Sequence, residues 1–284
     1  MPGVSFDRVA AFYDATRALP DGVAEAVREA LLVQVGARPD TRFLEVGVGT
    51  GRIALPFIRA GHAYCGVDLS GGMLGALRDK LAAGPRPGLV QGDAMRLPCR
   101  GGVFDVALLF HVIHLVDDPR ATLDEVRRVL RPTGRVVIST NDYDERAQRN
   151  RGRTDTAQFV ISRWNAILGD LGIDRSKRPW GGWVPDDELI GDLERRGASV
   201  ERAVLARYRE RPRTARQVAT AHRDRVFSSD WRIPDDVHAE ASRRLMQWLE
   251  REHPALDEPF TEDGAVAVLV GTFASPAGSS DRKY

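Results

Sequence analysis

The stretch FLEVGVGTGR, residues 43–52, decides the fold of this chain. It joins a short apolar run to a glutamate and to three glycines at alternate positions. A segment with apolar residues at helical spacing follows, and Gly61 ends it. Glycines in a turn between a strand and a helix let the backbone adopt positive φ and approach a ligand closely. The stretch therefore predicts the first strand, turn and helix of an α/β sheet that binds a nucleotide-like ligand.

The chain around this turn alternates strand and helix patterns. Strands are predicted at residues 42–47, 63–69, 88–94, 103–116 and 134–140. The continuous apolar run at 103–116 is typical of a strand buried on both faces. Ser70 and Asp118 each precede a helical pattern and are expected to cap it. Strands separated by helices predict a doubly wound, parallel α/β sheet with right-handed crossovers.

The pattern changes in the second half of the chain. A helix at 185–198 and strands at 199–208 and 264–274 extend the sheet to seven mostly parallel strands. Helical insertions that form a lid are expected at about residues 1–30, 143–180 and 212–252. No internal repeat and no linker rich in Gly or Ser separates two domains. We therefore expect one domain, residues 1–284, with a cofactor-binding core at about 36–142.

The composition is that of an ordinary globular protein. It is 43% hydrophobic with a formal net charge of +1, so no global field attracts it to nucleic acid or to an anionic membrane. The basic residues are almost all arginine, which a GC-rich coding bias explains better than phosphate binding; the lysines are Lys80, Lys177 and Lys283. Cys65 and Cys99 show neither disulfide nor zinc spacing. The sequence shows neither a signal-peptide core nor an apolar run of spanning length, so we expect a cytoplasmic protein with no membrane association and no metal.

Two kinds of glycine turn can follow the first strand of such a sheet. The dinucleotide fingerprint G-x-G-x-x-G needs a third glycine where this chain has Arg52. A phosphate-binding loop would end in Lys-Ser or Lys-Thr, which is missing here. The remaining pattern is E-x-G-x-G-x-G, beginning at Glu45, in which small residues let a bulky ligand lie on the backbone. Asp68, at the end of the next strand, is placed to accept hydrogen bonds from both hydroxyls of a ribose.

Five motifs follow one another between residues 42 and 140. They are LEVGVGTGR (44–52), VDLS (67–70), GDAMRLP (92–98), FDVALLFHVIHLVDD (104–118) and LDEVRRVLRPTGRVVIST (123–140). In this order and spacing they resemble the motifs of class I S-adenosylmethionine-dependent methyltransferases of the broad small-molecule type. The resemblance implies the Rossmann-like methyltransferase fold and S-adenosylmethionine as the methyl donor. Val48 departs from it, because many relatives carry a smaller or polar residue there.

The resemblance also assigns roles around the cofactor. The methionine part would lie on the glycine turn, with an acid anchoring its ammonium side, an acid on the ribose and a short turn reading the adenine. The residues implied are Glu45, Gly47, Gly49, Gly51, Asp68, Asp93 and Ala94. Leu69 and Met95 would form walls for the adenine, although each is equally well explained as core. His111 would line the methionine side. Tyr13 and Arg17 would grip the cofactor's carboxylate, unless their segment is a plain amphipathic helix.

Methyl transfer from a sulfonium is an in-line displacement, so the protein must align the reactants and exclude water, and a base is needed only for a protonated nucleophile. The sequence shows no catalytic dyad. Its candidates for a base are His111, His114 and Asp142. Aromatic candidates for a pocket under the lid are Trp164, Trp180, Trp183, Phe227 and Trp231, most of which are expected in the core. The acceptor and the oligomeric state cannot be read from these residues.

Three other functions compete with methylation of a small molecule. A nucleic-acid methyltransferase on the same fold is suggested by the Arg-rich segments at 146–153 and 207–225, but the segment that holds them is balanced in charge. The Asn/Asp-Pro-Pro-aromatic signature is also missing, and Pro98-Cys99 follows the third strand, where no cytosine nucleophile belongs. A nicotinamide oxidoreductase is disfavoured by the arginine in the last glycine place. A protein that binds the cofactor without catalysis stays open.

Overall fold

The computed structural model describes residues 6–7, 13–82, 84–140, 153–174, 184–253 and 255–274. The chain forms two compact units, each of which is described by itself. The first comprises Met1–Thr140, Val184–Ala206 and Val266–Tyr284, and the second Asn141–Trp183 and Arg207–Ala265. The ranges of both helical insertions expected after residue 143 fall within the second unit. That these insertions belong to one domain and act as its lid stays a prediction.

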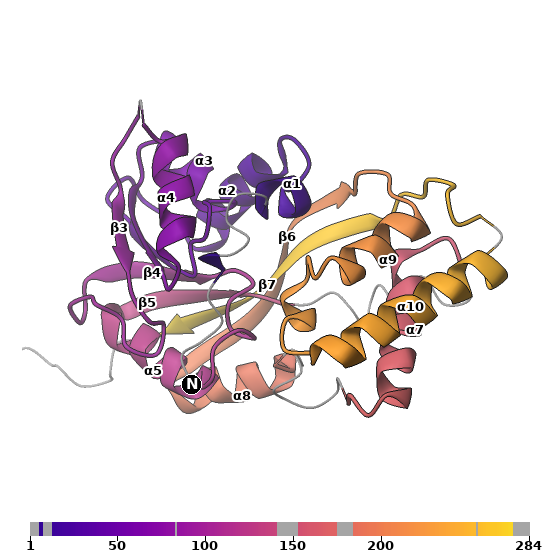
Figure 1. Ribbon diagram of the computed structural model, residues 1–284. Coiled ribbons are helices and arrows are strands. Elements are labelled where there is room, and N and C mark those ends of the chain that lie inside the picture. Colours follow the sequence, from indigo (N-terminus) through magenta and orange to yellow (C-terminus); the bar gives the residue numbers. More distant parts are fainter. Residues whose placement is uncertain are drawn as a thin grey trace, which may run out of the picture. The chain divides into compact units, whose positions relative to one another are not determined.

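The first unit is built on a sheet in which the described strands follow the order β3-β2-β1-β4-β5-β7-β6 (Figure 1). The strands are β1 (Arg42–Val46), β2 (Ala63–Asp68), β3 (Gly88–Gln91), β4 (Phe104–Leu109), β5 (Leu130–Ser139), β6 (Ala198–Arg209) and β7 (Asp263–Phe273). The first five strands pair in parallel, whereas β7 pairs antiparallel to β5, with Val270 opposite Val137. The predicted seven-stranded, mostly parallel sheet is confirmed.

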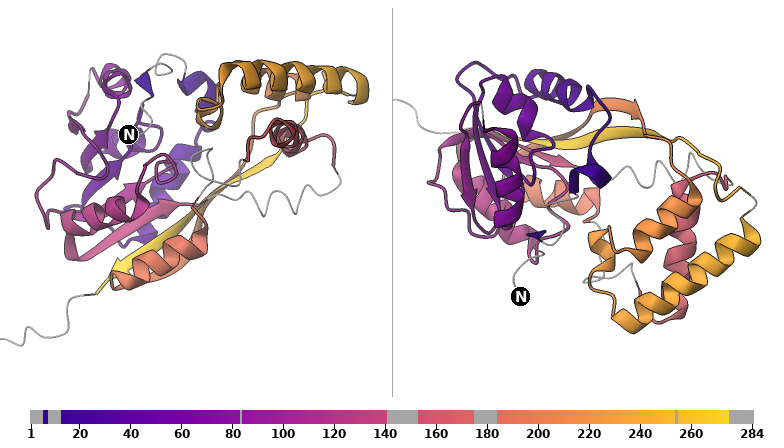
Figure 2. Two further views of the ribbon diagram at one scale, coloured as in Figure 1. Left: turned by 60° about the horizontal axis from the view of Figure 1, so that its bottom comes forward. Right: turned by 45° about the horizontal axis from the view of Figure 1, so that its top comes forward.

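Helices cover both faces of this sheet. In the first unit they are α1 (Tyr13–Arg17), α2 (Val23–Gln34), α3 (Ala54–Arg59), α4 (Gly71–Lys80), α5 (Pro119–Val129) and α8 (Asp186–Arg195). The helices α2, α3 and α4 lie on one face, and α5 and α8 lie on the other (Figures 1 and 2). The core under α5 and α8 joins Leu123 and Leu193 to buried strand residues such as Leu44 and Val136. This two-sided cover explains why the central strands are mostly apolar.

The predicted caps set where two helices begin. The Ser70 hydroxyl accepts the backbone N–H of Met73 at 3.1 Å, which starts α4. The Asp118 carboxylate accepts the N–H groups of Arg120 and Ala121 at 2.9 and 3.0 Å, which starts α5 with a proline at its beginning. Both residues were expected to cap because a side-chain oxygen satisfies an N–H that the first turn leaves unpaired.

The strand order determines where a ligand can bind. From β1 the chain continues outward to β2 and β3, whereas from β4 it continues in the opposite direction to β5. The strands β1 and β4 are neighbours, with Leu44 opposite Ala107. Their carboxyl ends therefore flank the point at which the winding of the sheet reverses, which is where open α/β sheets bind ligands.

One predicted strand is too long. The run 103–116 was expected to be a single buried strand, but β4 ends at Leu109. His111 has φ 54°, a left-handed value that a strand cannot contain, and its N–H donates to the Ser139 hydroxyl at 2.8 Å. The residues after the strand are apolar for a different reason, since Ile113 is 1% exposed in the core. The continuous apolar run therefore indicates that these residues are buried, and it does not indicate how long the strand is.

The second unit is a helical cluster around one buried tryptophan. Its described helices are α7 (Ala157–Asp170), α9 (Ala215–Arg223), the short 3₁₀ helix η2 (Ser228–Asp230) and α10 (Asp235–Glu252). Trp164 is fully buried, and its indole N–H donates to Asp230 at 3.1 Å. The other carboxylate oxygen of Asp230 lies 2.8 Å from Nδ1 of His222. Trp164 is therefore a core residue of this unit, as most of the aromatic candidates were expected to be.

Four further aromatic candidates and one candidate base fall in or near the second unit. Trp231 donates its indole N–H to the carbonyl of Arg225 at 2.7 Å, and the ring centre of Phe227 lies 4.6 Å from that of His222. Both are thus held within their own unit. Asp142, Trp180 and Trp183 lie outside the described residues.

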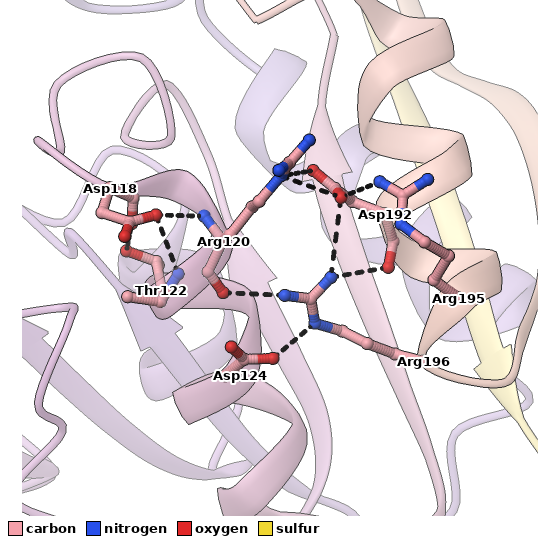
Figure 3. A network of polar contacts seen from close by, with 8 residues as sticks. Asp118, Arg120, Thr122, Asp124, Asp192, Arg195 and Arg196 are labelled. Carbon is pink, nitrogen blue, oxygen red and sulfur yellow. Dashed lines mark hydrogen bonds and ion pairs between the residues drawn. The ribbon is translucent and has the colours of Figure 1, made fainter.

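A buried carboxylate links α5 to α8 in the first unit (Figure 3). Asp192 is 1% exposed and forms ion pairs with three guanidinium groups, those of Arg120, Arg195 and Arg196. Arg196 also donates to the carbonyl of Arg120 at 2.9 Å and to Asp124 at 2.7 Å. Because burying a carboxylate without partners is costly, these contacts are required once Asp192 is in the interface.

We expect Asp192→Asn to lower the free energy of unfolding by about 2–4 kcal/mol, because it removes the buried charge that three guanidinium groups share. Urea unfolding followed by circular dichroism measures this difference. Asp124→Asn is the matched control, since the Asp124 side chain is 67% exposed and its ion pair is worth less than about 1 kcal/mol. Equal losses in the two variants would contradict this account.

Candidate functional site

The glycine turn after β1 is a left-handed backbone segment. Gly47, Gly49 and Gly51 have φ of 74°, 56° and 87°. Residues with a Cβ rarely adopt such values, so the turn requires glycine at each place. The N–H groups of Gly47 and Val48 both donate to the carbonyl of Val67, at 2.7 and 3.1 Å. The turn is therefore fixed against the end of β2.

The three glycines differ in what surrounds them. A Cβ on Gly47 would lie 2.6 Å from Val112, and a Cβ on Gly51 would lie 2.4 Å from Leu77. A Cβ on Gly49 would meet no described atom within 4 Å. Gly47 and Gly51 thus serve the packing of the fold, whereas the space beside Gly49 is open to a ligand.

Val48, the departure from the family pattern, is explained by its neighbour on β2. Its side chain is 3% exposed, and a Cβ on Gly66 would lie within 2.8 Å of it. The valine fills the space that the missing side chain of Gly66 leaves. It faces the sheet, so it leaves the open side of Gly49 unchanged.

Asp68 ties the glycine turn to the start of α4. One carboxylate oxygen accepts the N–H of Gly49 at 2.8 Å, and the other accepts the N–H of Ser70 at 2.9 Å. Burial raises the pKa of Asp68; the two backbone N–H groups oppose this change, and the nearby carboxylate of Asp7 adds to it. Each carboxylate oxygen has a further lone pair, so Asp68 can hold the turn and still accept hydrogen bonds from a ligand.

Glu45, the last acid of β1, is buried beside Tyr64. It is 2% exposed, and its carboxyl group accepts the Tyr64 hydroxyl at 2.7 Å. Burial raises the pKa of Glu45 to about 8; the Tyr64 hydrogen bond and the charge of Arg52 partly offset this, and the charge of Asp68 adds to it. The group is therefore mostly protonated at neutral pH. Sequence reasoning missed Tyr64, because a tyrosine early in β2 carries no local signal of its partner.

The helix α1 lies against the glycine turn. Asp14 accepts the hydroxyl of Thr50 at 2.6 Å, and Arg52 donates to the carbonyl of Arg17 at 3.2 Å. Two turn residues thus bind the helix that carries Tyr13 and Arg17. The sequence predicted that this segment meets the cofactor site, and the structure brings it to the turn. The grip of either side chain on a carboxylate stays a prediction.

His111 lies just beyond β4 among cationic groups. Its side chain is accessible to solvent, yet the surrounding protein disfavours the charged imidazolium and holds the pKa of His111 well below its usual value. The positive charges of Arg52 and Arg17, together with His114, lower it further. His111 is therefore neutral at pH 7 and can accept a proton. Arg52 follows the glycine turn, and Arg17 lies on α1.

The turn after β3 is shaped by its own acid. The Asp93 carboxylate accepts the N–H of Met95 at 2.8 Å, and the residue before Asp93 donates its N–H to the carbonyl of Asp68 at 2.9 Å. Leu69, Ala94 and Met95 are partly buried. The turn thus lies beside Asp68, as the adenine prediction requires. Contact of these residues with adenine stays a prediction.

Two features are absent from the described part of the chain. Among its residues, no three His, Cys, Asp or Glu side chains are grouped so that they could hold a metal ion. None of its helices combines the length and the apolar character needed to cross a membrane.

Several known proteins are similar to this chain in sequence. A family model described as "Methyltransferase domain" matches residues 44–138. A demethylmenaquinone methyltransferase of Streptomyces griseus is 36% identical over 134 residues, which are 47% of this chain and 57% of that protein. A phosphatidylethanolamine N-methyltransferase of Cereibacter sphaeroides is 33% identical over 159 residues, which are 54% of this chain and 75% of that protein. The chain thus spans little more than half the length of the demethylmenaquinone methyltransferase.

Solved structures share the fold. The YcgJ protein of Bacillus subtilis has a TM-score of 0.55 at 15% identity, covering 87% of this chain and 97% of that one. A phosphoethanolamine N-methyltransferase of Haemonchus contortus in complex with S-adenosylhomocysteine has a TM-score of 0.51 at 16% identity. The match covers 94% of this chain and 57% of that one.

The protonated state of Glu45 makes stability depend on pH. With a folded-state pKa of about 8, Glu45 keeps its proton between about pH 4.5 and 8, while the unfolded chain loses it. Stability that is present at low pH is therefore lost as pH rises through this window, by up to roughly 1.4 kcal/mol per pH unit. We expect the unfolding free energy of Glu45→Gln, measured in urea at pH 5 to 8, to lack this decline. Parallel pH profiles of the two proteins would contradict the assignment.

Proposed function

The chain belongs to the class I S-adenosylmethionine-dependent methyltransferases, and we propose that it transfers the methyl group of this cofactor to a small-molecule acceptor. Family membership rests on the relative from Cereibacter sphaeroides, three quarters of which the chain covers, and on the family model. The five motifs and the strand order agree with it. The identity of the methyl acceptor and the catalytic activity of the whole protein are what we propose.

The residues present fit the cofactor. Gly49 leaves open space where a ligand can approach the backbone, and Asp68 has lone pairs left for the ribose hydroxyls. Glu45 is a buried neutral acid that can ionise when an ammonium group arrives. The residues proposed to hold the cofactor are Tyr13, Arg17, Glu45, Gly47, Gly49, Gly51, Asp68, Leu69, Asp93, Ala94, Met95 and His111.

When bound, S-adenosylmethionine supplies an electrophilic methyl group on a positively charged sulfur. The chain contributes orientation, exclusion of water and a place for the acceptor's proton. We propose that a ring nitrogen of His111 takes this proton, because the imidazole is neutral at pH 7 and accessible to solvent.

The charge around His111 favours one class of acceptor. Arg52 and Arg17 lie close enough to His111 to lower its pKa, so a group beside it meets positive potential. An acceptor that becomes an anion, such as a phenolic hydroxyl, is stabilised there, whereas an ammonium group is repelled. We therefore propose a phenol of the quinol type as acceptor. The relative from Streptomyces griseus, a demethylmenaquinone methyltransferase, is consistent with this choice.

A second candidate is an amine. It is favoured by the phosphatidylethanolamine N-methyltransferase, of which the chain covers a larger share. Such an acceptor would have to enter as the neutral amine, because the cationic form would face Arg17 and Arg52.

Formation of S-adenosylhomocysteine, measured with a short-chain demethylmenaquinol and with phosphatidylethanolamine in mixed micelles, tests the acceptor. We expect turnover of the quinol and a fall in kcat of at least about 100-fold in His111→Asn, which removes the base. Asparagine suits this variant because it tolerates the left-handed φ of His111. Turnover of the lipid amine alone would favour the second candidate. Cofactor binding without turnover of either would indicate a different acceptor or a non-catalytic protein.

Gly49→Ala tests the cofactor site itself. We expect it to weaken binding of S-adenosylhomocysteine more than tenfold, because its Cβ would enter the space proposed for the methionine part. Isothermal titration calorimetry measures the affinity. Gly22→Ala is the matched control, since Gly22 also has a left-handed φ, 79°, and no described atom within 4 Å of its Cβ position. Both changes strain the backbone by about 1–2 kcal/mol, and equal affinities in the two variants would sink the assignment.

A further inference from the structure

A closed set of polar contacts joins α1 to the glycine turn and to the end of α4. Asp14 on α1 accepts the Thr50 hydroxyl at 2.6 Å through one oxygen. Its other oxygen lies 2.5 Å from the ammonium nitrogen of Lys80. The same ammonium group donates to the carbonyl of Thr50 at 2.8 Å. Each of the three residues therefore bonds to both of the others.

Lys80 is chemically unusual for this chain. It is one of three lysines among 41 basic residues, so the strong preference for arginine is broken at this place. The contacts explain why. A compact ammonium group can meet a carboxylate and a carbonyl at the same point, whereas a planar guanidinium directs its donors in a wide, fixed fork.

These contacts differ from an ordinary surface ion pair. The Lys80 side chain is 28% exposed and that of Asp14 is 44% exposed, so both are partly shielded from solvent. Thr50 is fully buried within the turn. Truncation of the Asp14 side chain would therefore leave a buried hydroxyl without the acceptor it now has, a larger penalty than loss of an exposed pair.

A second contact attaches the N-terminal segment on the other side of Asp68. The carboxylate of Asp7 accepts the Ser70 hydroxyl at 2.5 Å and the N–H of Gly72 at 2.8 Å. Asp68 itself binds the N–H groups of Gly49 and Ser70. The described N-terminal residues are thus fixed at two points. One lies next to Gly49 and the other at Ser70, the two residues whose N–H groups Asp68 accepts.

The contacts of Asp14 also determine where α1 presents its own side chains. Arg17 lies on the same short helix, and its carbonyl accepts the Arg52 guanidinium at 3.2 Å. Five residues are too few for an isolated helix to be stable, so α1 depends on these external contacts for its place.

We propose that Asp14 and Lys80 are positioning residues that hold α1 across the cofactor site and thereby slow the exchange of cofactor. This inference rests on the proposed function, because it takes the glycine turn to be the cofactor site. Neither side chain is required to touch the reacting atoms. Their effect is exerted through α1, which places Tyr13 and Arg17 beside the turn.

Stopped-flow and calorimetric measurements with S-adenosylhomocysteine test this role in the full chain. We expect Asp14→Asn and Lys80→Met each to raise the dissociation rate about tenfold and to weaken the affinity by a similar factor. The double variant should release S-adenosylhomocysteine no faster than the faster of the two single variants, because each change breaks the same set of contacts. Lys80→Arg should fail to restore the wild-type rate. At saturating cofactor kcat should stay within about twofold, while KM for cofactor rises.

Asp40→Asn is the matched control. It makes the same chemical change in an exposed ion pair of the same unit, with Arg38 at 3.6 Å, and should leave the exchange of S-adenosylhomocysteine unchanged. Wild-type dissociation rates in the Asp14 and Lys80 variants would overturn the proposal. Failure of the wild-type protein to bind S-adenosylhomocysteine or S-adenosylmethionine would instead refute the proposed function.

A measurement on the wild-type protein keeps the inference testable if the variants do not fold. Hydrogen exchange followed by mass spectrometry should show the amides of residues 13–17 at least about tenfold slower with S-adenosylhomocysteine bound. The amides of α2 should change little. Bound cofactor without added protection of residues 13–17 would overturn the proposal.

Discussion

The site depends on a left-handed backbone turn whose N–H groups are bonded to the end of the neighbouring strand. The turn cannot continue the pairing of β1, so Gly47 donates to the carbonyl of Val67, and Gly49 donates to the carboxylate of Asp68. Asp68 also receives the N–H of Ser70, at the start of α4. One carboxylate thus joins a turn, a strand end and a helix start, and every other element of the site is placed relative to these three.

The same arrangement explains the electrostatics of the site. Burial raises the pKa of both Glu45 and Asp68, so negative charge is less favourable here than in water and a cation beside these acids would stabilise it. Beyond β4 the charges act in the opposite sense, because burial first, and then the positive charges of Arg52 and Arg17, lower the pKa of His111. A cationic cofactor would balance the negative charge of the two acids. An acceptor that becomes an anion would balance the positive charge of the two arginines.

Much of the fold could be predicted from the sequence because its signals are local. Ser70 and Asp118 cap helices through bonds to residues two or three positions away, and the glycine pattern lies within one turn. The end of β4 could not be predicted, since the apolar run continues into core residues that lie outside the strand. Asp14 and Lys80 are far apart in the chain, and their contact arises only when α1 and α4 meet at the turn.

The glycine motif shows why a pattern alone does not separate packing from binding. All three glycines have left-handed φ, so all three satisfy the same sequence signature. At Gly47 and Gly51 a larger residue would also clash with Val112 and Leu77. The fold would therefore require glycine at these two places even in a protein that binds no ligand. Gly49 has no such neighbour among the described residues, and its N–H is the one that Asp68 accepts. In the proposed cofactor site, the central glycine and its acid would therefore contact the ligand, within a turn that the outer two glycines make possible.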